Sequence, residues 1–214
     1  MGLLTLKQST LAYRLDFAIY GVGIAALAGT LLVAAPRTDA LALALCSVGG
    51  LAGWSALEYV IHRFVLHGLQ PFRRWHAAHH RHPGELICSP TVFSASLILA
   101  LVFLPALAVA GAWRGCAVTL GVLVGYFGYY LMHHAMHHWR AEGAGSWLGR
   151  RKLWHAQHHR DPVRGRCYGV TSGLWDTLLG TGARRRGTSG AESPVRTPSV
   201  SPPAPTSRPD TERP

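Results

Sequence analysis

Four long stretches of the chain carry no aspartate, glutamate, lysine or arginine and consist mainly of apolar residues. They cover residues 17–35, 40–57, 86–113 and 115–132. A helix needs about 20 apolar residues to cross the hydrocarbon layer of a bilayer, and fewer where flanking side chains reach the headgroups. Each stretch is therefore long enough for one transmembrane helix. The pattern predicts an all-α integral membrane protein with about four transmembrane helices.

The connections between these stretches predict how the helices are paired. Residues 36–39 join the first two stretches, and Trp113 and Arg114 join the last two, whereas a long polar segment separates the two pairs. Short turns of this kind connect antiparallel neighbours. We therefore expect two helical hairpins that enter the membrane from the same side.

The end of the chain has a different composition. From residue 182 onward it consists mostly of Arg, Ser, Thr and Pro and has no large aromatic residue. Such a segment cannot bury enough apolar surface to offset the entropy lost on ordering. The chain is accordingly divided into a membrane-embedded domain at 1–181 and a disordered tail rich in Ser, Pro and Arg at 182–214.

Charge changes this picture by orienting the helices. The formal net charge is +11, and of all the lysines and arginines only Arg37 and Arg114 fall on the side of the two short turns. Basic residues accumulate on the cytoplasmic side of membrane proteins. We therefore expect a multi-pass protein with both termini in the cytoplasm. No aromatic and basic reading surface accompanies the charge, so nucleic-acid binding is not expected.

Histidine is the residue with the most informative distribution. All 13 histidines lie between His62 and His159, in four short clusters on the predicted cytoplasmic side. The clusters are His62 and His67; His76, His79, His80 and His82; His133, His134, His137 and His138; and His155, His158 and His159.

The spacing within three of these clusters favours metal binding. Residues three or four positions apart share one face of a helix, so several imidazoles can point to one place. His62 and His67 are five positions apart, about 140° around an ideal helix. We therefore expect them to bind two different metal ions or to lie where the helix unwinds. So many ligands exceed the capacity of one ion, which predicts a dinuclear centre.

The absence of two glutamate-containing metal motifs limits which metal chemistry the site can perform. Soluble di-iron bundles use Glu-x-x-His pairs, and zinc proteases use His-Glu-x-x-His; neither motif occurs here. A site made almost entirely of histidine near lipid fits oxygen activation by iron better than hydrolysis.

Five segments carry a resemblance to a known family. EYVIHRFVLH, WHAAHHRHP, YYLMHHAMHH, WHAQHH and CYGVTSGLWDTLLGT, which lie within residues 54–181, resemble the fatty acid hydroxylase/sterol desaturase superfamily, and most of all its fatty acid 2-hydroxylase-like branch. The resemblance implies a non-haem di-iron, O2-dependent membrane enzyme with a cytoplasmic histidine-rich helical cap. The ligand roles that it implies fall on His62, His67, His76, His79, His80, His134, His138, His155, His158 and His159.

Four residues near these ligands, His133, His137, Glu58 and Asp176, have two interpretations each. His133 and His137 have the same spacing as His134 and His138. The second pair is preferred because, with Tyr130, it matches the Tyr-x-x-x-His-x-x-x-His pattern of the family. Glu58 and Asp176 either orient a ligand imidazole through its second N–H or serve at the membrane interface, Glu58 as an ion pair with Arg63.

The resemblance also implies a substrate and partners. The substrate is a lipid acyl chain, of a fatty acid or of a sphingolipid or ceramide. The predicted place of the histidine clusters at the membrane interface, where a lipid headgroup stops, favours oxidation near the carboxyl end of that chain. An external electron donor of the ferredoxin or cytochrome b5 type is expected, with iron as the metal and zinc able to replace it in purified protein. Two alternatives are a carotenoid (beta-carotene) hydroxylase or a sterol oxidase or desaturase. A membrane metal-binding or transport protein is a third, although transporters hold their ligands near the bilayer midplane.

Overall fold

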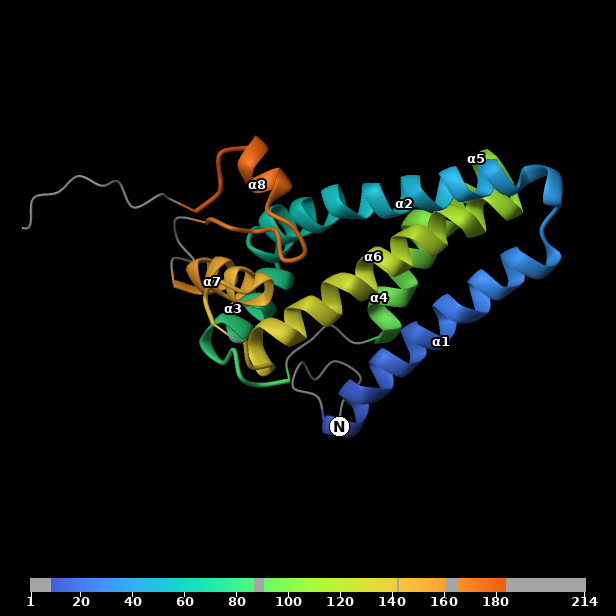
Figure 1. The fold of residues 1–214 in the computed structure, drawn as a ribbon. Coiled ribbons are helices and arrows are strands. Elements are labelled where there is room, and N and C mark those ends of the chain that lie inside the picture. The colour runs from blue at the N-terminus through green and yellow to red at the C-terminus, as the bar shows by residue number, and fades with distance from the viewer. Residues whose placement is uncertain (1–8, 87–90, 142, 161–164, 184–214) are drawn as a thin grey trace, which may run out of the picture. The chain divides into compact units, whose positions relative to one another are not determined.

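The computed structural model describes residues 9–86, 91–141, 143–160 and 165–183, and helices make up nearly all of this part of the chain (Figure 1). The elements in order are α1 (Thr10–Ala34), η1 (Arg37–Asp39), α2 (Ala40–Val60), η2 (Ile61–Leu66), α3 (Phe72–Arg81), α4 (Thr91–Ile98), η3 (Leu99–Phe103), α5 (Leu104–Ala110), α6 (Ala112–His138), α7 (Trp147–Arg160) and α8 (Leu174–Leu178). No strand occurs in these residues. The all-α prediction is confirmed. Most of the predicted tail, residues 184–214, lies outside the described residues.

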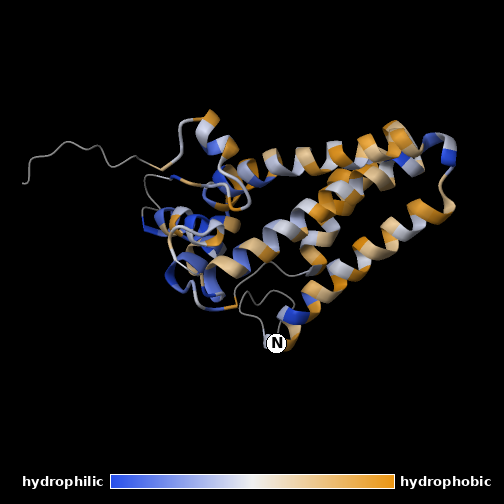
Figure 2. Cartoon of the chain, viewed as in Figure 1, coloured by the Kyte–Doolittle hydropathy of each residue, from blue (hydrophilic) through white to orange (hydrophobic). Residues whose placement is uncertain are grey.

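Four helical segments are long and apolar enough to cross a membrane. They are Thr10–Ala34, Arg37–Leu66, Thr91–Ala110 and Ala112–His138. The short turns that join α1 to α2 and α5 to α6 lie at one end of these segments, and the polar helices α3 and α7 gather at the other end (Figures 1 and 2). The chain is thus a multi-pass membrane protein with two helical hairpins and a helical cap.

The second hairpin turns slightly earlier than predicted. Gly111 has φ +80°, and α6 begins at the next residue, so Trp113 and Arg114 belong to its first turn. Glycine adopts a positive φ without the steric cost that a Cβ imposes. The break therefore occurs at the glycine rather than at the polar residue.

The central contact of the bundle is between α2 and α6. A Cβ atom on Gly121 would collide with the carbonyl oxygen of Ser47, and one on Gly50 would collide with that of Val118. The ring of Trp54 lies directly over Gly125. Small residues allow such close approach of helices in a membrane, and this contact fixes the rotation of α6 about its axis.

The helix α1 is attached through its first half. The ring of Phe17 stacks on Tyr130 of α6 at 4.3 Å between centroids. The hydroxyl groups of Tyr20 and Ser94 are 2.7 Å apart, and Thr91 donates a hydrogen bond to buried Asp16. These contacts hold α1 against α6 and α4.

Candidate metal centre

Two groups of histidines converge where α2 and α6 meet the cap. Within each group, one ring nitrogen per histidine lies within 4.8 Å of the others. The first group contains His62, His67, His76, His80 and His158, and the second contains His79, His137, His155 and His159. Eight of the ten predicted ligands belong to these groups.

The first group depends on the π-helix η2. His62 and His67 belong to the same group, with ring centroids 5.3 Å apart. A π-helix closes its hydrogen bonds between residues i and i+5 and so brings residues five apart close to one face. The structure thus places both histidines in one group rather than in two, and it has the modified helix end that was the alternative expectation.

Within each group, the histidines approach one another most closely through their Nε2 atoms. In the first group, His76 Nε2 is 3.0 Å from both His62 Nε2 and His80 Nε2. In the second group, His155 Nε2 is 2.9 Å from His137 Nε2 and 3.0 Å from His159 Nε2.

The two groups are neighbours because α3 and α7 each contribute to both. The rings of His80 and His159, one from each group, stack at 4.3 Å. His79 of the second group is one residue away from His80 of the first. The arrangement has the form of a dinuclear site.

The third cluster differs from the prediction. His137 is a member of the second group, and the ring of His133 is 4.6 Å from that of His79. His134 instead lies 3.1 Å from the Tyr13 hydroxyl through Nδ1, and exposed His138 stacks on it. The structure therefore brings His133 and His137, not His134 and His138, toward the other histidines.

The residues fit metal ions in two respects. Ligands about 2.1 Å from a metal lie about 3.0 Å from one another in octahedral and about 3.4 Å in tetrahedral coordination, and neighbouring Nε2 atoms here are 2.9–3.2 Å apart. Several buried ring nitrogens also have no hydrogen-bond partner among the described residues, including both nitrogens of His79. Buried polar atoms are normally paired, so these nitrogens fit a bound ion.

The electrostatic setting favours neutral imidazoles. Burial, together with neighbouring histidines, lowers the pKa of His79 and of His158 to about 3 and that of His80 to about 2. The neutral form is the one that binds metal. These histidines are therefore ready to bind metal at neutral pH.

Two imidazoles of the first group are oriented by backbone carbonyls. His62 Nδ1 donates to the carbonyl oxygen of Tyr168 at 2.6 Å, and His158 Nδ1 donates to that of Arg166 at 2.8 Å. A carbonyl only accepts, so Nδ1 carries the hydrogen and Nε2 is left for a metal. The sequence contains no signal for these contacts, because any residue type supplies a carbonyl.

Glu58 and Asp176 have a different role from either that the sequence suggested. Glu58 accepts hydrogen bonds from the backbone N–H groups of Val170 and Thr171, at 2.6 and 2.9 Å. Asp176 accepts from those of Tyr168 and Gly169, at 2.9 and 2.7 Å. Arg63 donates to the Tyr59 hydroxyl rather than to Glu58. Both carboxylates thus hold a backbone segment.

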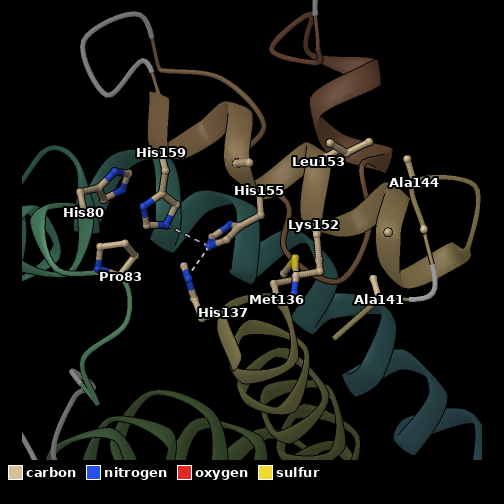
Figure 3. A pocket seen from close by; sticks show the side chains of 13 residues that line it. His80, Pro83, Met136, His137, Ala141, Ala144, Lys152, Leu153, His155 and His159 are labelled. Carbon is tan, nitrogen blue, oxygen red and sulfur yellow. Dashed lines mark hydrogen bonds between the residues drawn. The ribbon is translucent and has the colours of Figure 1, made fainter. Parts of the chain in front are cut away.

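A cavity of about 610 Å³ adjoins the second group (Figure 3). His137, His155 and His159 line it on one side. The other walls consist largely of small or apolar residues, among them Ala144, Ala156 and Leu153 of the cap. The cavity gives a molecule access to the second group of imidazoles.

Comparison with known proteins extends this picture. The sequence profile of the fatty acid hydroxylase family matches residues 47–181. The chain is 32% identical over 143 residues to the dihydroceramide fatty acyl 2-hydroxylase FAH2 of Arabidopsis thaliana, covering 62% of this chain and 58% of that protein. It is 32% identical over 146 residues to the ceramide very long chain fatty acid hydroxylase scs7 of Schizosaccharomyces pombe, covering 62% and 40%.

A mammalian relative and a solved structure agree with this. The fatty acid 2-hydroxylase of Homo sapiens is 31% identical over 139 residues, covering 60% of this chain and 37% of that protein. The matches therefore span about two fifths to three fifths of these relatives' lengths. The structure of full-length scs7p, in which only the hydroxylase domain is visible, has a TM-score of 0.70 at 21% identity and covers 84% of this chain and 68% of that chain. This likeness supports the fold.

Proposed function

The chain belongs to the fatty acid hydroxylase family, and we propose that it is a di-iron membrane monooxygenase that uses O2 to hydroxylate a lipid acyl chain. The observation that carries the proposal is the pair of adjacent histidine groups with converging Nε2 atoms. Imidazole ligands suit iron, and zinc competes for the same ligands in purified protein. The ligands in this proposal are the nine histidines of the two groups, with His133 beside them.

The reaction needs an electron source outside the described residues. Hydroxylation converts a C–H bond, O2, two electrons and two protons into a C–OH group and water. When bound, the two irons supply the activation of O2. An external donor of the ferredoxin or cytochrome b5 type supplies the electrons.

The residues of this chain perform the remaining tasks. The carbonyl groups of Tyr168 and Arg166 hold two imidazoles in the orientation that metal binding requires. The buried ring of Tyr168 packs against His62, His67 and His158 and covers the first group on that side. The apolar spans hold the acyl chain in the lipid phase while the cap holds the metal ligands.

The position of the site favours attack near the polar end of the substrate. The histidines lie at the ends of α2 and α6, where the apolar spans meet the polar cap. A lipid headgroup stops at this level of a bilayer. The names of the relatives refer to fatty acyl and ceramide 2-hydroxylation, so a fatty acid or a ceramide-type lipid hydroxylated at carbon 2 is the substrate of this proposal.

The orientation in the membrane follows from charge. Of the arginines and lysines that the sequence contains, only Arg37 and Arg114 belong to the end with the short turns. The cap and both termini therefore face the cytoplasm. A reporter enzyme fused after Ala183 should be active in the cytoplasm, and activity on the opposite side would refute this orientation.

Lipid analysis tests the activity. The chain would be expressed in a host together with a ferredoxin or cytochrome b5 reductase system, and hydrolysed lipids would be measured by mass spectrometry. New 2-hydroxy fatty acids, absent with the His79→Ala variant, are expected. Hydroxylated carotenoids or oxidised sterols with unchanged acyl chains would refute the acyl substrate. Unchanged lipids with every donor would refute the enzyme.

A further inference from the structure

Residues 166–171, here called the strap, form a buried non-helical segment whose backbone is almost fully hydrogen-bonded. The side chains from 167 to 170 are buried. Cys167 N donates to the Thr181 carbonyl, and the next four N–H groups donate to Asp176 and Glu58. Arg151 donates to the carbonyls of Gly169 and Val170, at 2.6 and 2.8 Å. Buried loops are rare because their backbone groups need partners, so this strap is held in one conformation.

The strap connects the two carboxylates to the first histidine group. Its carbonyls at Arg166 and Tyr168 accept the Nδ1–H groups of His158 and His62. Glu58 is 3% exposed and Asp176 is fully buried. Hydrogen bonds from backbone N–H groups to buried carboxylates are charge-assisted and therefore strong. Moving either carboxylate would move the carbonyls that orient the imidazoles.

The second histidine group has no such support in the part of the chain that the structure describes. The Nδ1 atoms of His79, His155 and His159 are buried and have no hydrogen-bond partner there, which in the first group is true of His80. No carbonyl therefore fixes which nitrogen of these three rings carries the hydrogen, whereas carbonyls do so for His62 and His158. The two groups, which are similar in residue type, thus differ in how firmly their ligands are oriented.

We propose that Glu58 and Asp176 are positioning residues of the first histidine group, acting through the strap, and that the first group consequently binds its metal ion more tightly and fills before the second. The inference rests on the proposed dinuclear site but not on the reaction. A carboxylate that is connected to an imidazole through two hydrogen bonds and the strap backbone between them still restricts the orientation of the ring. Loss of partners that orient metal ligands typically lowers metal affinity by about 10–100-fold.

The test separates the two groups by ligand variants. His137→Ala removes one ligand from the second group and leaves the first complete, and His67→Ala does the reverse. The affinity of each full-length, detergent-purified protein for Co²⁺ would be measured by competition with a chelator, and the visible absorption of Co²⁺ would report its coordination. We expect tighter binding in the His137→Ala protein than in the His67→Ala protein.

The positioning residues are then changed in both backgrounds. Glu58→Gln and Asp176→Asn should weaken Co²⁺ binding about 10–100-fold in the His137→Ala protein and shift its absorption bands. In the His67→Ala protein, the change should be less than about threefold. The control is Asp16→Asn, because Asp16 is also a buried, hydrogen-bonded carboxylate but accepts from Thr91 and not from the strap. It should leave both affinities unchanged.

Several results would overturn the proposal. These are equal weakening in both backgrounds, no weakening in either, or tighter binding by the second group. If Glu58→Gln does not fold, Thr171→Val removes the hydroxyl that donates to Glu58, and Thr171→Ser restores it; an equal Co²⁺ affinity of these two proteins would contradict the role of Glu58. Absence of hydroxylated lipid would count against the proposed function alone, whereas absence of Co²⁺ binding would refute both.

Discussion

His62 donates a hydrogen bond from Nδ1 to the carbonyl oxygen of Tyr168 over 2.6 Å, and the two residues stand 106 positions apart in the chain. The contact ties the end of α2 to the strap and leaves Nε2 of His62 facing His76. The imidazole of His62 is thus oriented by a backbone carbonyl, which a residue of any type at position 168 would supply.

This relationship predicts opposite results for two substitutions at one position. Tyr168→Phe keeps the backbone and should retain the metal content of the wild type. Tyr168→Pro removes the N–H group that donates a hydrogen bond to Asp176. Proline is also sterically disfavoured after Cys167, because the φ of Cys167 is +57° and a residue before proline prefers an extended backbone. It should lose metal from the first group. Metal analysis of the two purified proteins tests this, and equal metal content would contradict the role of the strap.

The rotation of α6 predicts which histidines of the third cluster matter. His133→Ala and His137→Ala should abolish or greatly reduce hydroxylation, because both rings lie among those of the second group. His138→Ala should retain most of it, because His138 is exposed. Product formation by mass spectrometry, normalised to protein in the membrane, is the measurement. Loss of activity with His138→Ala and retention with His137→Ala would reverse the assignment.

The contact between α2 and α6 predicts a stability difference between two glycines of one helix. Gly121→Ala places a methyl group against the Ser47 carbonyl and should destabilise the protein by about 1–3 kcal/mol, as overpacking does. Gly128→Ala meets nothing within 4 Å and should leave the stability unchanged or slightly raised. Thermal unfolding in detergent measures both. Equal melting temperatures would mean that the helices are not in close contact at Gly121.

The cavity beside the second group predicts that a substitution filling it lowers activity without loss of metal. Ala156→Phe adds a ring to the cavity wall and should lower product formation at least tenfold while the metal content stays that of the wild type. Gln157→Phe is the matched control, because Gln157 is the next residue on α7 and is exposed like Ala156 but does not line the cavity. Equal activity of the two variants would exclude the cavity as a route to the metal centre.

The hydrophobic pattern was sufficient to predict the four spans, because span length and the exclusion of charge are local properties of the sequence. The convergence of the histidines also followed from spacing and topology. The choice between two histidine pairs on α6 did not, because both have the same spacing. A helix returns to the same direction after 11 or 18 residues, so His133 lies over Val122 and His137 over Thr119, both of which are buried. The burial of these two positions became known only from the packing of α6 on α2.

Two further features required the structure for a different reason. The π-helix that brings His62 and His67 together depends on one extra residue per turn at the end of α2, which the sequence pattern does not indicate. The sequence drew attention to Glu58, but the partners of its carboxylate are backbone N–H groups more than a hundred residues away. Contacts of that kind leave no pattern in the side chains.

The iron content of the purified protein tests the dinuclear centre most directly. Anaerobically reconstituted wild-type protein should hold two irons per chain. The variants His67→Ala and His137→Ala, each of which removes a ligand from one group, should hold about one iron each. One iron in the wild type, or two in both variants, would contradict the assignment of one metal ion to each histidine group.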